Sequence, residues 1–194
     1  MPRGTEPDAW GLIFDIDGVI ANTEPLAIQA THTVFHNLNG ATIDPADIME
    51  YMGSTATAYF AALGAKYAPE ASLQKLIKDH NRLLLKELRS ARDLIFPGVR
   101  PLFIRAGSDS SCRLAFATGS GRKRSEATIA ACSLPTDGLR AWLTGDDIAR
   151  PKPDPEIYTK TVAALGILPG RCVAIEDSIA GVESAKSAGM KCVA

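Results

Sequence analysis

Two acidic residues follow an apolar run near the N-terminus of the sequence. Residues 12–14 are Leu-Ile-Phe, Asp15 comes directly after them, and Asp17 follows two residues later. The apolar run predicts a buried strand, and a carboxylate at the end of such a strand is costly to bury unless a metal ion or a reaction uses it. We therefore predict that Asp15 is a nucleophile, that Asp17 is its acid/base partner, and that Mg²⁺ binds between them.

Further polar residues follow other apolar runs along the chain. Thr118 and Gly119 come directly after one run, and Glu176 and Asp177 come directly after another. Lys152 lies between two prolines, just before a predicted helix. Ligands of a parallel sheet bind outside the carboxyl ends of its strands, so we expect these side chains to converge on one pocket with the two N-terminal acids.

This set of residue types fits phosphoryl transfer. A carboxylate can attack phosphorus only when its repulsion from the phosphate is cancelled, and Mg²⁺ prefers carboxylate oxygens, water and phosphate as ligands. A lysine adds a point charge, and a threonine hydroxyl and glycine amides add hydrogen-bond donors. The predicted catalytic residues are Asp15, Asp17 and Lys152; the predicted phosphate-binding residues are Thr118, Gly119 and Lys152; the predicted Mg²⁺ ligands are Asp15, Asp17 through its backbone carbonyl, Glu176 and Asp177.

The elements that would position these residues alternate between strand and helix. Residues 1–22 and 97–194 predict an α/β core with a doubly wound, Rossmann-like and mainly parallel sheet. In residues 23–96, Ala, Leu, Lys, Glu and Gln dominate and apolar residues recur at helical spacing, which predicts an inserted all-α domain. Thr23 and Glu24 stand where the chain enters this insert, at a natural hinge, and could touch substrate there.

The composition is that of an ordinary globular protein. The 194 residues carry a net charge of −1 and 46% of them are hydrophobic, which fits a large core with a modest insertion. The lack of a basic excess argues against nucleic acid as a partner, and no apolar run approaches the ~20 residues that span a bilayer. The N-terminus lacks the apolar segment of a signal peptide, so we expect a cytoplasmic protein without a membrane partner, monomeric or alternatively homodimeric.

The cysteines and histidines have ordinary interpretations. The four cysteines are widely spaced, and we expect them to be buried, reduced and small hydrophobic residues: Cys112, Cys132, Cys172 and Cys192. The three histidines lie in the predicted helical insert, and no catalytic role is assigned to them: His32, His36 and His80.

The polar motifs have alternative interpretations as well. The two N-terminal acids could be incidental residues of a turn, but they do not start an EF-hand, because Ile20 and Leu26 occupy the positions that require glycine and glutamate. A dinucleotide-binding loop beginning at Gly119 is a weak alternative, because the third glycine position is Arg124.

Several charged residues could serve structure alone. Glu176 and Asp177 could cap the helix that follows them, and Lys152 by itself could be a surface lysine. The basic run at residues 122–124 is expected to be a solvated helix face rather than a contact to substrate phosphate. The aspartates at residues 146–147 could line the rim of the pocket, and an additional metal-ligand role for them is the lesser expectation.

Four short motifs follow one another along the chain: Asp15-Ile16-Asp17-Gly18-Val19, Thr118-Gly119-Ser120, Lys152-Pro153 and Glu176-Asp177-Ser178. In order and spacing they resemble the four motifs of the haloacid-dehalogenase-like hydrolase superfamily. The insert after the first motif resembles the small helical cap of the subfamily that contains β-phosphoglucomutases and phosphoglycolate-type phosphatases. This resemblance covers essentially the whole chain. It implies a magnesium-dependent phosphatase that hydrolyses a small phosphorylated metabolite, such as a sugar phosphate, through an aspartyl-phosphate intermediate.

The sequence departs from the mutases of that subfamily at two places. The mutases carry a histidine shortly after the position of Glu24, where this sequence reads Pro25-Leu26-Ala27, and an arginine shortly after a cap glycine, where Gly53 is followed by Ser-Thr-Ala. Both differences favour a phosphatase over a mutase. Family members also complete the last strand and add a final helix, whereas this sequence ends at Ala194.

Three alternatives to a phosphatase remain at this point. One is a hexose-phosphate mutase of the β-phosphoglucomutase type, and another is a non-catalytic module that binds a phosphorylated metabolite. A dehalogenase is less favoured, because the dehalogenases of the superfamily need no metal and lack the acid that corresponds to Asp17.

Overall fold

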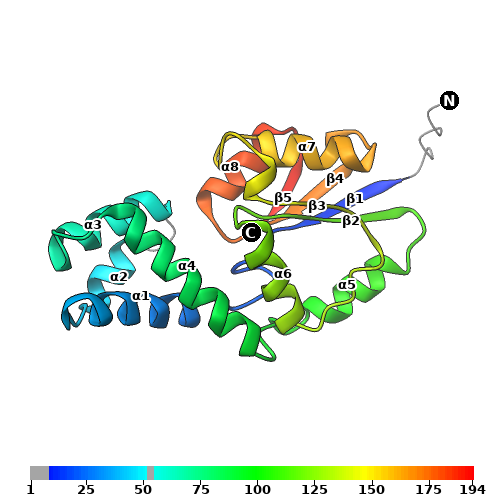
Figure 1. The fold of residues 1–194 in the computed structure, drawn as a ribbon. Coiled ribbons are helices and arrows are strands. Elements are labelled where there is room, and N and C mark those ends of the chain that lie inside the picture. The colour runs from blue at the N-terminus through cyan, green and yellow to red at the C-terminus, as the bar shows by residue number, and fades with distance from the viewer. Residues whose placement is uncertain (1–8, 52–54) are drawn as a thin grey trace. The chain divides into compact units, whose positions relative to one another are not determined.

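The computed structural model describes residues 9–51 and 55–194, and a five-stranded sheet forms the centre of the larger of its two units (Figure 1). The strand order is β3-β2-β1-β4-β5, and each neighbouring pair is parallel. The strands are β1 (Trp10–Phe14), β2 (Cys112–Ala117), β3 (Leu139–Leu143), β4 (Cys172–Ile175) and β5 (Lys191–Val193). Because all strands run the same way, their carboxyl ends share one edge.

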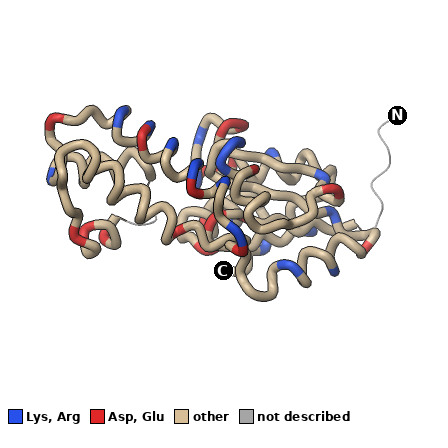
Figure 2. Tube along the Cα trace, turned by 60° about the horizontal axis from the view of Figure 1, so that its bottom comes forward, with Lys and Arg blue, Asp and Glu red and all other residues tan. Residues whose placement is uncertain are grey.

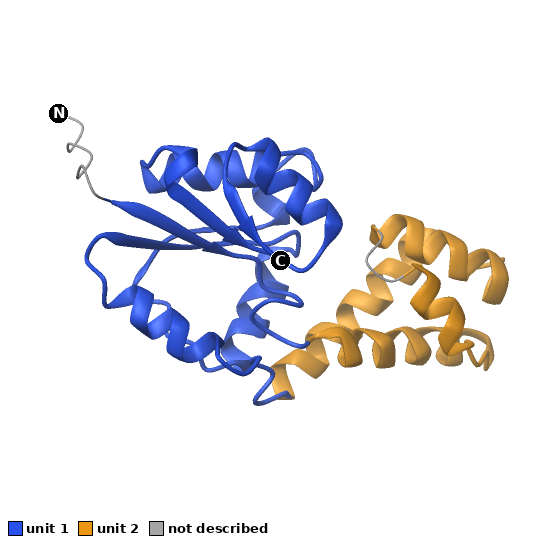
Figure 3. Cartoon of the chain, turned by 180° about the vertical axis from the view of Figure 1, so that it is seen from behind, with its two compact units in different colours: residues 1–22, 91–194 blue, residues 23–90 orange. Residues whose placement is uncertain are grey.

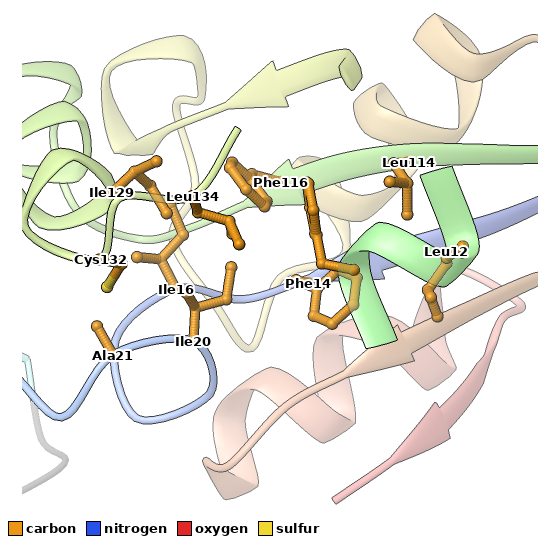
Figure 4. Packing of buried hydrophobic residues seen from close by; sticks show 12 residues of the cluster. Leu12, Phe14, Ile16, Ile20, Ala21, Leu114, Phe116, Ile129, Cys132 and Leu134 are labelled. Atoms are coloured by element: carbon orange, nitrogen blue, oxygen red, sulfur yellow. The ribbon is translucent and has the colours of Figure 1, made fainter. Parts of the chain in front are cut away.

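Helices cover both faces of this sheet. Side chains alternate along a strand, so Leu12 and Phe14 of β1 pack on one face and Ile13 packs on the other. The first face is covered by α5 (Val99–Gly107) and α6 (Arg122–Ala131), through Phe103 and Ile129 among others. Figure 4 shows Ile129 in this cluster together with Phe14 and Phe116 of the sheet. The second face is covered by α7 (Glu156–Leu165) and α8 (Ile179–Ser187). The predicted doubly wound, parallel α/β fold is confirmed.

Short 3-10 helices complete two of the connections. η1 (Gly145–Asp147) follows β3, and η2 (Pro169–Arg171) precedes β4. Both lie in the larger unit, which comprises residues Met1–Asn22 and Ala91–Ala194.

The second unit, Thr23–Ser90, contains helices only among its described residues (Figure 3). Its helices are α1 (Glu24–Asn39), α2 (Pro45–Tyr51), α3 (Ala56–Tyr67) and α4 (Leu73–Ser90). Local sequence sets their ends: α1 stops at Gly40, whose φ of 76° suits glycine, and the Thr55 hydroxyl caps α3 by accepting from Ala58 N–H. Val34, Phe35, Phe60, Leu63 and Leu76 are among the buried residues of its own core.

The insert ends earlier than the sequence analysis placed it. The expected boundary lay after residue 96, whereas the compact helical unit stops at Ser90. Residues 94–96 are extended and pair with the loop after β1, since Asn22 N–H donates to the Leu94 carbonyl and Phe96 N–H donates to the Ile20 carbonyl. This backbone pairing joins residues 94–96 to the core unit, although the paired segments are about 75 residues apart in the chain.

Acidic and basic residues are interspersed along the chain, in keeping with its net charge of −1 (Figure 2). Among the described residues, none of the helices is both long and apolar enough to cross a membrane. All four cysteines are free, with Cys132 and Cys172 buried and the other two partly buried.

Candidate active site

The first, second and fourth motifs begin at the carboxyl ends of three adjacent strands. Asp15 follows β1, Thr118 follows β2 and Glu176 follows β4. Backbone pairing continues into these positions, because Asp15 N–H donates to the Ile175 carbonyl at 3.0 Å and Thr118 N–H donates to the Leu143 carbonyl at 3.1 Å. The sheet therefore holds the side chains at its edge with little backbone freedom.

Lys152 reaches this edge from the connection between η1 and α7. Its Nζ donates to Asp15 Oδ1 at 2.7 Å and to the Ala117 carbonyl at 3.2 Å, and it also donates to Glu176 Oε1. The Lys152 side chain is only 11% exposed, so these charges interact with little screening by water. Burial lowers the pKa of Lys152, but the two carboxylates outweigh that effect, and the pKa lies above its usual value. The lysine is a held cation at the end of β1, not a surface residue.

Asp15 is buried among charges of both signs. Burial raises its pKa to about 7, Lys152 opposes that rise, and the nearby Glu176 adds to it. The net effect shows that the ammonium group of Lys152 does not offset the cost of burying the Asp15 charge. A carboxylate in such surroundings is characteristic of functional sites and of cation-binding sites.

Three carboxylates are placed to bind a cation together. Asp15, Glu176 and Asp177 each offer one oxygen, and these oxygens lie within 4.8 Å of one another. Burial and the adjacent Glu176 raise the pKa of Asp177 as well. Three ionised carboxylates against one ammonium, that of Lys152, leave two negative charges, so the oxygen donors and the charge both fit a divalent cation.

Two glycines provide the space in which these carboxylates lie. A Cβ on Gly18 would lie 1.8 Å from Asp177 Oδ2, and the φ of +80° at Gly18 disfavours any other residue. A Cβ on Gly181 in α8 would lie 2.0 Å from Glu176 Oε2. The glycines of the first and fourth motifs thus allow the backbone to approach the acidic group closely.

Asp17 lies beside the cluster, and its side chain faces α6. Its Oδ2 accepts a hydrogen bond from Ser120 Oγ at 2.6 Å, and its Oδ1 accepts one from Arg124 Nη2 at 3.0 Å. Its side chain is therefore not among the three clustered carboxylates. The expectation that Asp17 binds the metal concerns its backbone carbonyl and stays a prediction.

Arg124 is a residue whose place the sequence analysis missed. The basic run was expected to be a solvated helix face, but the Arg124 side chain is only 32% exposed and pairs with Asp17. No local signal indicates this contact, because it joins residues 107 positions apart in the chain.

The other members of the basic run have separate roles. Arg122 donates to the Trp142 carbonyl at 2.6 Å and pairs with Asp147, while Lys123 is exposed. Asp146 accepts from Arg122 N–H at the start of α6, and Asp147 accepts from the backbone and hydroxyl of Thr144. These contacts give both aspartates a structural role at the turn after β3.

Thr118 and Gly119 form the turn after β2. Thr118 is 1% exposed, and its Oγ1 accepts from Ser120 N–H at 3.1 Å, which fixes the turn. No atom lies within 4 Å of where a Cβ on Gly119 would be, so its backbone is open to a ligand. Both residues lie next to the end of β1, where the sequence analysis expects a phosphate to bind.

A family model described as haloacid dehalogenase-like hydrolase matches residues 12–194, which include all four motifs. The chain belongs to this family. The haloacid dehalogenase-like chain is 29% identical to a fructose-1-phosphate phosphatase, YqaB of Escherichia coli, over 94% of each protein. It is also 27% identical to SUPPRESSOR OF QUENCHING 1 of Arabidopsis thaliana, over 96% of this chain and 18% of that much longer protein.

Among solved structures of the family, a mutant of CbbY from Rhodobacter sphaeroides in complex with xylulose-(1,5)bisphosphate superposes with a TM-score of 0.81. That chain is 26% identical to this one, and the match covers 95% of this chain and 84% of CbbY. The fold of the haloacid dehalogenase-like core is thus the fold of these relatives.

The helical unit supplies none of the three clustered carboxylates. His80 is buried within it, where its Nε2 lies 3.2 Å from the Ala27 carbonyl and its ring contacts Phe60. Residues 25–27, which replace the mutase histidine, lie in α1, whereas Gly53 and Ser54 fall outside the described residues. Thr23 directly precedes α1 at the boundary between the units.

Proposed function

We propose that this chain is a magnesium-dependent phosphatase that hydrolyses a small phosphorylated metabolite through a phosphoryl group carried on Asp15. The observation that carries the proposal is the position of the Asp15 carboxylate. It lies at the end of β1, hydrogen-bonded to Lys152 and clustered with the acids of the fourth motif. Membership of the haloacid dehalogenase-like hydrolase family supports hydrolysis as the reaction.

The metal site in this proposal consists of Asp15, Glu176 and Asp177, with the backbone carbonyl of Asp17. When bound there, Mg²⁺ would supply positive charge to the phosphate oxygens. Lys152 would neutralise the nucleophile and hold one phosphate oxygen, as its position 2.7 Å from Asp15 Oδ1 permits.

Asp17 transfers the proton in both covalent steps of the proposed reaction. An Asp15 oxygen forms a bond to phosphorus as the bond from phosphorus to the leaving oxygen breaks, and Asp17 gives that oxygen a proton. Water then attacks phosphorus and gives its proton to Asp17, which restores Asp15 and releases phosphate. Thr118 and the open backbone of Gly119 would donate hydrogen bonds to the phosphate during both steps.

The helical unit is proposed to be a cap that excludes water and selects the substrate. It is inserted directly after the first motif, and its own core makes it a compact body able to move as one piece. The substrate class proposed is a sugar phosphate, because the related YqaB acts on fructose 1-phosphate and CbbY binds a xylulose bisphosphate.

Release of phosphate from para-nitrophenyl phosphate tests the proposal. We expect turnover that needs Mg²⁺, stops with a chelator and is lost in Asp15→Asn, while the exposed Asp137→Asn keeps it. Turnover that survives in Asp15→Asn would end the nucleophile assignment. A panel of sugar and glycolytic phosphates would then define the substrate, and conversion of β-glucose 1-phosphate to the 6-phosphate would indicate a mutase instead.

A further inference from the structure

Tyr158 of α7 contacts the charged groups of the site from within the core. The residue is 0% exposed, and its hydroxyl donates to Glu176 Oε1 at 2.6 Å. Lys152 Nζ lies 5.0 Å from the centre of its ring, which is within the range of a cation–π contact. Burial, and next the charge of Glu176, raise the pKa of the Tyr158 hydroxyl, so the group stays protonated and acts as a donor.

The space around Tyr158 does not require a hydroxyl. Phenylalanine would supply the same ring to the core and to Lys152, and burying a hydroxyl costs free energy unless it is hydrogen-bonded. The role of the hydroxyl therefore lies in its hydrogen bond to Glu176, a carboxylate of the proposed metal site.

The two oxygens of Glu176 have different surroundings. Oε1 accepts from both Tyr158 and Lys152, whereas Oε2 accepts from Ser178 Oγ at 3.2 Å. Both oxygens lie close to the bare backbone of Gly181. Without Tyr158 the ammonium of Lys152 would be the sole side-chain donor to Oε1 among these contacts. The carboxylate could then turn further toward the lysine, in competition with a cation.

We propose that Tyr158 is a positioning residue for the divalent cation: its hydroxyl holds Oε1 of Glu176 so that Oε2 serves the metal, while its ring supports Lys152. The inference rests on the proposed magnesium site. It means that α7, through a residue outside the four motifs, contributes to metal affinity. Partners that orient metal ligands in this way typically contribute about 10–100-fold in metal affinity.

Titration of the full chain with Mg²⁺ in a calorimeter, without substrate, measures this role directly. Tyr158→Phe keeps the ring and removes only the hydroxyl, so it should fold, which its far-UV circular dichroism verifies. We expect its Kd for Mg²⁺ to rise about 10-fold, the lower end of the usual range, because the ring and Lys152 stay in place. Phosphate release should recover at saturating Mg²⁺, with a raised activation constant and a nearly unchanged kcat.

Tyr59→Phe is the matched control. Tyr59 lies in the helical unit, and its hydroxyl likewise donates one hydrogen bond, to Thr31 Oγ1 at 3.1 Å. The control should leave the Kd for Mg²⁺ unchanged. An equal loss of affinity in both variants would overturn the inference, and so would an unchanged Kd in Tyr158→Phe.

The outcomes also separate this inference from the proposed function. Magnesium-dependent hydrolysis with an unchanged Kd in Tyr158→Phe would refute the role of Tyr158 alone. A Kd raised only in Tyr158→Phe, in a protein that releases no phosphate, would refute the phosphatase and keep the role of Tyr158. A wild-type chain that binds no Mg²⁺ would refute both.

Discussion

Removing the charge of Asp15 is expected to stabilise the metal-free protein at neutral and alkaline pH. Burial raises the pKa of this carboxyl from its ordinary value of 3.8 to about 7 in spite of Lys152. The folded state therefore keeps a proton that the unfolded state has already released. Asparagine has nearly the same shape as the protonated acid, so Asp15→Asn avoids the cost of ionising a buried group.

The sign and size of the effect follow from the two pKa values. Between pH 3.8 and about 7 the folded state binds more protons, so the free energy of unfolding of the wild type falls as pH rises through this range. If the pKa of Asp15 shifts fully from 3.8 to about 7, the free energy of unfolding changes by about 4 kcal/mol at most. Because the charges of Lys152 and Glu176 both act on the Asp15 carboxylate, we expect about half of this limit: a difference of about 2 kcal/mol at pH 8, and close to zero at pH 4.

Urea unfolding followed by tryptophan fluorescence is a suitable assay. The two tryptophans, Trp10 in β1 and Trp142 in β3, both belong to the core unit, so their signal reports the unit that contains Asp15. With EDTA present, the midpoint of Asp15→Asn should exceed that of the wild type at pH 8 and approach it at pH 4. Asp137→Asn, at an exposed position, should follow the wild type throughout.

Magnesium should reverse this order at pH 8. A ligand that binds only the folded state stabilises it, and the wild type keeps three clustered carboxylates where the variant keeps two. Parallel stability curves for the two proteins in EDTA, or a variant that is less stable at pH 8, would refute the argument that Asp15 is strained by burial among like charges.

Two further substitutions test contacts around the site. Arg124→Ala removes the ion pair to Asp17, and we expect turnover of an alkyl phosphate, whose leaving group needs a proton, to fall about 10-fold. This is less than the ~10²–10⁴-fold that acid–base catalysis contributes, because Asp17 itself stays in place. The effect on para-nitrophenyl phosphate should be smaller. The exposed Lys123→Ala is its control, and an equal loss with both substrates would contradict a role through the acid. Gly181→Ala should weaken Mg²⁺ binding and lower the urea midpoint although alanine favours helices, because its Cβ would lie 2.0 Å from a carboxylate oxygen. Gly170→Ala, where the added Cβ meets no atom within 4 Å, should leave both quantities unchanged, and a neutral Gly181→Ala would contradict the close packing.

Short-range patterns in the sequence were sufficient for the architecture. Apolar runs followed by turn residues predicted the positions of β1, β2 and β4. A buried strand needs successive apolar residues, and the turn residues after it mark where the strand ends. Local sequence also sets the starts of two helices, because α2 begins at Pro45 and the Thr55 hydroxyl caps α3. The parallel sheet was predicted from the sequence, and the carboxyl ends of parallel strands lie at one edge. The convergence of Asp15, Thr118 and Glu176 at that edge could therefore be predicted from the sequence as well.

Contacts between distant segments were not accessible in this way. The ion pair of Arg124 with Asp17 joins residues 107 positions apart, and nothing in the local pattern of a basic helix start distinguishes it from a solvated face. The end of the helical unit at Ser90 depends on backbone pairing of residues 94–96 with the loop after β1, which leaves no mark on composition. His80 reads as a polar residue on an amphipathic helix, yet tertiary packing buries it.

The residues proposed as nucleophile, metal ligands and site lysine could therefore be chosen from the sequence itself, since their residue types and their places after strands suggest the chemistry. Tertiary structure alone showed how each group is held: the pKa of Asp15 near 7, the side chain of Asp17 turned toward α6, and Tyr158 bonded to Glu176. The physical reason is that burial and pairwise charge depend on distances of a few ångströms between segments far apart in the chain, and such distances exist only once the chain has folded.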